Sequence, residues 1–62
     1  MLKITIETGG SAFEPLEYEC ARILDKCARY LEAKAEFEDN TDYKAPLMDI
    51  NGNKVGEMEV IR

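Results

Sequence analysis

Residues 15–35 have the periodicity of a helix. In the segments before and after them, apolar residues largely alternate with polar ones. Within residues 15–35, apolar side chains recur every three or four positions and so line one face of a helix: Leu16, Cys20, Ile23, Leu24, Cys27 and Leu31. Pro15 is expected at the first position, where a missing N–H costs no intrahelical hydrogen bond. A single helix can cover only one side of a sheet.

The residues before the helix predict one strand. Leu2, Ile4 and Ile6 alternate with polar residues, which is the period of a half-buried strand. Two glycines then let the chain turn. We therefore expect a strand over residues 2–8, with its apolar side chains toward the helix.

The residues after the helix predict a loop and a hairpin. Residues 36–44 are acidic and contain turn-forming residues, so we expect an acidic loop there. Asn51-Gly52 is a strong hairpin signal, because a type I′ turn requires positive φ at both central positions. Strands are accordingly expected over residues 46–50 and 54–61.

Two residues of the hairpin constrain how its strands pack. Pro46 has no N–H to donate, which places the 46–50 strand at an edge of the sheet. Gly56 lies inside the outgoing strand, where glycine indicates a bulge or a close approach of the helix. We expect the 54–61 strand in the centre, antiparallel to both neighbours. The prediction is a single βαββ domain of the α+β class over residues 1–62, with a three-stranded, mainly antiparallel sheet and the helix on one face.

The apolar residues of the hairpin cannot all face the helix. If Met58 and Val60 point inward, the others project from the uncovered face of the sheet: Met48, Ile50, Val55 and Ile61. An apolar group rimmed by polar residues on a small domain is typical of an association surface. We therefore expect a homo-oligomer, with a dimer favoured, or another protein partner bound through this face.

Phe37 and Tyr43 are two aromatics in an otherwise polar loop. They either close the end of the core or anchor a partner, as loop aromatics often do. Both are kept as interface candidates.

The composition argues against a catalytic or metal centre. The chain has no histidine, so the commonest general base and zinc ligand are missing. Cys20 and Cys27 would lie roughly 10 Å apart on a helix, too far for a disulfide, and cannot complete a zinc site alone. The stretch from Glu38 to Asp49 resembles a calcium loop only faintly, because Tyr43 stands where that loop needs glycine. We expect no cofactor, no metal and no enzymatic activity.

The charge balance restricts the classes of molecule that the protein is expected to bind. Thirteen acidic and eight basic residues give a net charge of −5, which repels nucleic acids and anionic membranes. No apolar run is long enough to span a bilayer, and no signal peptide is recognised, so a cytoplasmic protein is expected. Arg22, Lys26 and Arg29 form a helical stripe suited to phosphates, but Asp25 is spaced to pair with both arginines.

Several stretches together resemble small uncharacterised proteins encoded in bacteriophage and prophage genomes. They are Leu2-Lys3-Ile4-Thr5-Ile6-Glu7-Thr8, Ala12-Phe13-Glu14, Glu19-Cys20-Ala21-Arg22-Ile23-Leu24, and the run from Leu47 to Val60. The resemblance implies a phage accessory protein expressed inside a bacterial cell, and it brings no catalytic residues.

The favoured functional hypothesis is thus a non-enzymatic phage accessory protein that acts by protein–protein binding, for example to counteract a host defence. One alternative is a nucleic-acid-associated factor that uses the Arg22/Lys26/Arg29 stripe. Another is a sponge that traps a small molecule at an oligomer interface.

Overall fold

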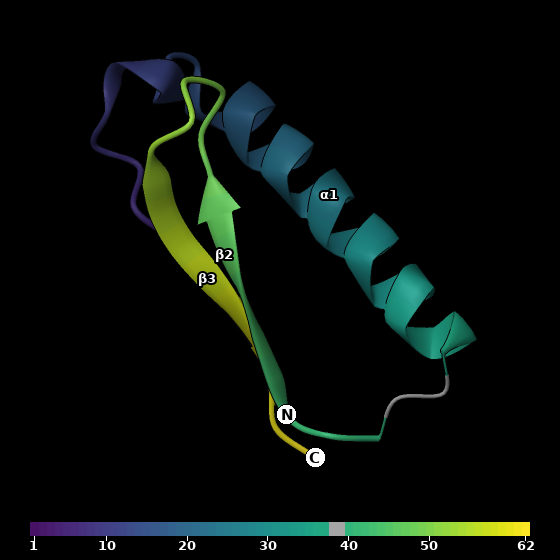
Figure 1. Cartoon of the computed structure of the whole chain (residues 1–62). Coiled ribbons are helices and arrows are strands. Elements are labelled where there is room, and N and C mark those ends of the chain that lie inside the picture. Colours follow the sequence, from purple (N-terminus) through teal and green to yellow (C-terminus); the bar gives the residue numbers. More distant parts are fainter. Residues whose placement is uncertain (38–39) are drawn as a thin grey trace.

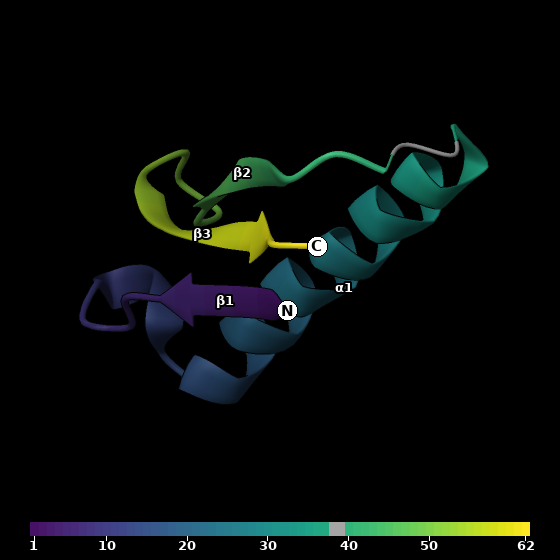
Figure 2. The same ribbon diagram turned by 90° about the horizontal axis from the view of Figure 1, so that it is seen from below.

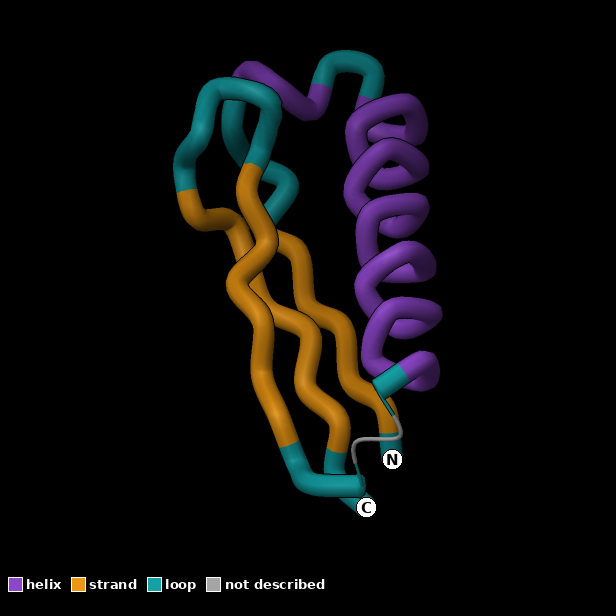
Figure 3. Tube along the Cα trace, turned by 45° about the vertical axis from the view of Figure 1, so that its right-hand side comes forward, coloured by secondary structure: helices purple, strands orange, loops and turns teal. Residues whose placement is uncertain are grey.

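The computed structural model describes residues 1–37 and 40–62. Its elements are strand β1 (Leu2–Ile6), the 3₁₀ turn η1 (Ser11–Phe13), helix α1 (Leu16–Glu36), strand β2 (Tyr43–Met48) and strand β3 (Lys54–Val60). The helix lies along one side of the three strands (Figure 1 and Figure 3). The α+β class and the βαββ order are confirmed. Within the described residues, no helix has both the length and the apolar character needed to cross a bilayer.

The sheet has the strand order β1-β3-β2, and β3 is antiparallel to both neighbours. The expected central position of the last strand is therefore confirmed. Met58, in the middle of β3, lies opposite Ile4 on one side and Ala45 on the other. Because side chains alternate along strands, these three residues share the face that the helix covers.

The core lies between the middle of α1 and the middle of the sheet. Ile4 and Ile6 of β1 pack against its buried members, which come from η1, α1, β2 and β3: Phe13, Ile23, Cys27, Ala45, Leu47 and Met58. Ile23 and Met58 are the largest side chains that are fully buried. Cys20 and Cys27 are both free thiols, and burial raises the pKa of Cys27. Cys27 therefore packs as a small, protonated, apolar group.

Helix α1 begins and ends one residue later than expected. Pro15 caps the helix in an extended conformation instead of occupying its first position, and the helix continues through Glu36. Part of its predicted apolar face is uncovered, since Leu16 and Leu24 are 42% and 45% exposed. Figure 2 shows that the helix crosses the sheet obliquely, so that its first turns project beyond β1.

The hairpin differs from the prediction in its turn. β2 ends at Met48 and β3 begins at Lys54, so a longer connection of five residues replaces the tight turn predicted at Asn51-Gly52. Gly52 does adopt a positive φ of 84°. The predicted strands over 46–50 and 54–61 are corrected to Tyr43–Met48 and Lys54–Val60.

The predicted acidic loop over 36–44 is shorter at both ends. Glu36 is the last helical residue, whereas Tyr43 and Lys44 open β2. Glu38 and Asp39 lie outside the described residues.

The uncovered face of the sheet is mostly polar, whereas an apolar group was expected there. Its side chains come from alternate positions of the three strands, and Met48 is the one expected residue among them: Lys3, Thr5, Lys44, Pro46, Met48, Glu57 and Glu59. Glu59 lies opposite Lys3 and Lys44, and Lys44 Nζ approaches its carboxylate to 3.8 Å. Val55, expected on this face, packs against the core.

A bulge explains the position of Val55. Leu47 pairs with Gly56 whereas Met48 pairs with Lys54, so β3 carries one residue more than β2 at this point. An extra residue breaks the strict alternation of side chains along a strand. The Val55 side chain therefore points toward the core and not toward the open face. The bulge predicted at Gly56 is confirmed, but the element that approaches it closely is β1 and not the helix.

Candidate functional site

A buried carboxylate ties the hairpin to the helix. Glu19 is 6% exposed, and its Oε1 and Oε2 accept hydrogen bonds from Arg22 Nε at 2.7 Å and Nη2 at 3.1 Å. Oε2 also accepts the backbone N–H of Ile50 at 2.8 Å, and Arg22 donates to the carbonyl of Met48 at 3.2 Å. These contacts hold the end of β2 beside α1.

A second buried carboxylate shapes the turn. Asp49 Oδ1 accepts the backbone N–H groups of Asn51 and Asn53, each at 2.9 Å. Its backbone N–H donates to the carbonyl of Asn53 at 2.9 Å, and its carbonyl accepts from Gly52 at 3.0 Å. The side chain thereby closes a five-residue turn, as aspartate at the start of a turn often does.

Hydrogen bonds lower the pKa of both carboxyl groups, chiefly from Arg22 for Glu19 and from the Asn53 backbone for Asp49. Folding therefore favours the ionised forms. The resulting stabilisation is complete above the ordinary carboxyl pKa and is lost as the pH falls through the lowered values.

We accordingly expect the thermal midpoint to fall steeply below about pH 4. Glu19→Gln should lower the midpoint at pH 7 and make its decline in acid shallower, because one of the two groups no longer titrates. Glu17→Gln, an exposed neighbour in the same helical turn, is the control and should change little. Thermal unfolding followed by circular dichroism from pH 2 to pH 8 checks this; identical curves for both variants would contradict it.

Beside this anchor, α1 and β2 form the walls of a groove of about 230 Å³. Met48, Pro46 and Leu47 line it from the strand, and Lys26 and Tyr30 from the helix. Its floor reaches the buried core at Ile23, Cys27 and Met58. We call this the α1–β2 groove.

The apolar surface continues toward the end of the helix. Tyr30 also lines a second hollow of about 260 Å³, together with Ala33, Lys34 and Phe37. The Phe37 side chain is 82% exposed. The groove and this hollow therefore meet at Tyr30, and together they follow one flank of α1.

Cations border this flank. Lys34 Nζ lies 5.7 Å from the ring centre of Tyr30 and 4.8 Å from that of Tyr43, within the range of cation–π attraction. The two rings are 5.9 Å apart, centre to centre. Lys26 stands in the groove wall. The chain is acidic overall, yet its apolar flank carries positive charge.

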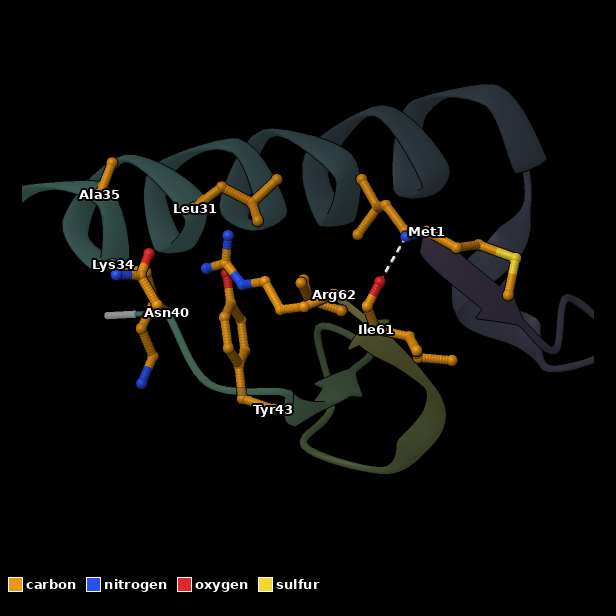
Figure 4. Close-up of a pocket in the computed structure, with 10 residues that line it drawn as sticks. Met1, Leu31, Lys34, Ala35, Asn40, Tyr43, Ile61 and Arg62 are labelled. Carbon is orange, nitrogen blue, oxygen red and sulfur yellow. Dashed lines mark hydrogen bonds between the residues drawn. The ribbon is translucent and has the colours of Figure 1, made fainter. Parts of the chain in front are cut away.

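A wider cavity of about 580 Å³ opens at the far end of the molecule, between the last turns of α1 and the strand ends (Figure 4). Leu31 and Ala35 border it from the helix, and Tyr43 and Ile61 from the sheet side. The N-terminal ammonium of Met1 donates to the carbonyl of Ile61 there. This cavity joins both chain ends and is distinct from the groove.

The interface residues expected from the sequence do not form one patch. Met48 lines the groove and is 43% exposed, while Ile50 projects from the turn with 68% exposure. Tyr43 and Ile61 border the end cavity, and Phe37 the hollow beside Tyr30; Val55 packs against the core, as noted above. Tyr30 and Lys26 were not predicted as groove residues, because the oblique path of the helix decides which of its flanks faces β2.

The basic stripe on α1 is largely neutralised by its own neighbours. Arg22 is held by Glu19 in the anchor described above. Arg29 lies 3.7 Å from Asp25 and 3.8 Å from Glu32. Carboxylates therefore compensate the charge of two of the three basic residues that were predicted to contact a phosphate backbone.

No family of proteins, curated protein or solved structure matches this chain. Within residues 1–37 and 40–62, no group of three or more acidic or cysteine side chains is placed to hold a metal ion. The site is thus defined by its own geometry: an apolar groove with a cationic border on a small α+β domain.

Proposed function

We propose that this chain is a non-enzymatic accessory protein of a bacteriophage that works in the cytoplasm of its host by binding another protein through the α1–β2 groove. The observation that carries the proposal is the groove itself, an apolar channel that reaches the core between Met48 and Tyr30. Exposed apolar surface with a polar rim favours protein contact. The phage origin rests on the sequence resemblance.

The groove favours a partner segment with an apolar side chain flanked by carboxylates. The apolar group would fill the channel above Ile23, where it loses contact with water. The carboxylates would lie near Lys26, where opposite charges give specificity and faster association. An acidic, apolar segment of a host defence protein fits this description.

The directions in which the pKa values of Glu19, Asp49 and Cys27 are shifted favour a binding protein over an enzyme. Glu19 and Asp49 are held ionised by several donors, and Cys27 is kept protonated by burial. A general acid or a nucleophile needs the opposite shift. Hydrogen bonds account for the shifts of the two carboxyl groups, and burial accounts for that of Cys27.

A library of random displayed peptides, selected against the purified protein, tests the proposal. We expect the enriched peptides to share an apolar residue next to Asp or Glu. Their affinity should fall about tenfold in Met48→Asp, which places a charge in the groove, and on the order of fivefold in Lys26→Glu.

Lys44→Glu is the matched control. It changes the net charge equally, but Lys44 points to the open face of the sheet and is 61% exposed. No enrichment, or equal losses in Lys26→Glu and Lys44→Glu, would contradict binding at the groove.

The nucleic-acid alternative is less well supported, because Arg22 and Arg29 have carboxylate neighbours. A gel shift at low salt separates the two hypotheses, since binding to phosphates weakens steeply as salt is added. We expect no shift of DNA or RNA.

A further inference from the structure

The two edges of the sheet differ in their ability to accept another strand. At the β2 edge, Tyr43, Ala45 and Leu47 lie opposite even-numbered residues of β3. The odd-numbered residues of β3 bond to β1, as the bonds from Ile61 N to Met1 O and from Glu7 N to Val55 O establish. Backbone groups of alternate residues in an antiparallel strand point to opposite sides. The residues of β2 whose backbone groups point to the free edge of the sheet are therefore Lys44 and Pro46.

Proline cannot donate a backbone hydrogen bond, so an added strand would lack a donor at Pro46. The β2 edge is accordingly closed by its own sequence. By the same alternation, the backbone N–H and carbonyl groups of Leu2, Ile4 and Ile6 point away from β3, toward the free edge of the sheet. All three have an N–H and a carbonyl, and within residues 1–37 and 40–62 no hydrogen bond joins these groups to another element. The β1 edge is open.

Uncovered apolar side chains lie along the open edge. Leu2 is 49% exposed and Leu24 is 45% exposed. Leu24 lies about 160° around the helix axis from Lys26, hence on the flank away from the α1–β2 groove. In Figure 2 the first turns of α1 project beyond β1 on the side away from β3. A strand added to β1 would therefore meet apolar side chains as well as backbone groups.

We infer that the occupant of this edge is the β1 strand of a second copy of the chain, paired antiparallel about a two-fold axis at Thr5. The charges of β1 favour this arrangement. Lys3 and Glu7 are symmetrically placed about Thr5, so antiparallel pairing sets Lys3 of each copy opposite Glu7 of the other. Parallel pairing would instead place like charges together, which is unfavourable.

The same register satisfies the backbone and the apolar face. Ile4 of each copy lies opposite Ile6 of the other, and these are the residues whose N–H and carbonyl groups point outward. The Thr5 side chains meet across the axis, which is a favourable cross-strand pair. The product is a six-stranded sheet with both helices on one face and an isologous interface. The groove lies on the opposite flank of each copy, so this interface and the proposed partner site are independent.

Charge reversal tests the register directly. Lys3 and Glu7 are roughly 13 Å apart along one strand, so they cannot pair within a chain. We expect sedimentation equilibrium to give twice the chain mass of 7.0 kDa for the natural protein. Lys3→Glu or Glu7→Lys alone should raise the dimer dissociation constant on the order of tenfold, because two attractive pairs become repulsive. The double variant, Lys3→Glu with Glu7→Lys, should restore the natural value.

Lys44→Glu again serves as control, since it makes the same charge change at the closed edge. Circular dichroism verifies that each variant is folded, which exposed positions should allow. A monomer at every concentration would overturn the inference. So would a dimer that responds to Lys44→Glu as strongly as to Lys3→Glu, or single-variant losses that the double variant does not repair.

Discussion

Gly56→Ala is expected to lose most of its folded population. A Cβ at this position would lie 1.8 Å from the carbonyl oxygen of Thr5 and 3.1 Å from the Cα of Ile6. Both are backbone atoms of β1, so no rotamer change relieves the overlap and the strands must separate. Overpacking in a core typically costs about 1–3 kcal/mol, and more where backbone must shift. A domain of this size has only about 3–5 kcal/mol from its core.

Urea unfolding measured by circular dichroism tests this expectation. Gly10→Ala is the matched control, because nothing lies within 4 Å of a Cβ there and its φ is −80°. It should stay within about 0.5 kcal/mol of the natural protein. Equal stability of the two alanine variants would show that β1 does not approach β3 as described.

Met58→Ala is also expected to have a large effect, a loss of about 2–5 kcal/mol in the free energy of unfolding. Met58 is fully buried in the central strand, between Ile4 and Ala45. Removing its side chain leaves a cavity that two flanking strands and a helix cannot fill without moving. The remaining stability would be marginal for so small a domain.

Met48→Ala makes the same substitution at an exposed methionine of β2 and is compared with Met58→Ala. Its side chain is 43% exposed at the groove, so truncation should cost less than about 1 kcal/mol. Denaturant midpoints at constant slope measure both changes. A larger loss for Met48→Ala than for Met58→Ala would contradict the placement of the core.

Local patterns predicted the order of the helix and strands, with errors in some bounds. The period of Leu2, Ile4 and Ile6 identified β1, although the strand ends at Ile6 and not at residue 8, and the spacing of apolar residues identified α1 to within a residue at either end. These signals depend on neighbours in the sequence alone. Pro46 correctly placed its strand at an edge for the same reason.

The turn and the open face were less predictable, because each depends on a competing local contact. Asp49 supplies a carboxylate that binds two backbone N–H groups and so replaces the two-residue turn favoured by Asn51-Gly52. The bulge at Leu47/Met48 then changes which side Val55 faces. Gly56 signalled a bulge, but not the direction in which its neighbours turn.

The groove depends on tertiary packing and has no simple sequence signal. The oblique crossing of α1 determines that Tyr30 and Lys26 face β2 while Leu24 does not. A hint was present in Glu19, which precedes the buried Ile23 by four residues and thus lies on the same helical face. An acidic residue at such a position indicates a buried partner, here Arg22 and the hairpin.

Site-specific photocrosslinking in bacterial cells tests most directly whether the α1–β2 groove binds a partner protein. A benzophenone side chain would replace Met48, which lines the groove, or Lys44, which points to the polar open face. We expect a discrete adduct with a second protein from position 48 that is absent from position 44 and becomes weaker when Lys26→Glu is added. The same adducts from both positions, or none from position 48, would contradict a binding role for the groove.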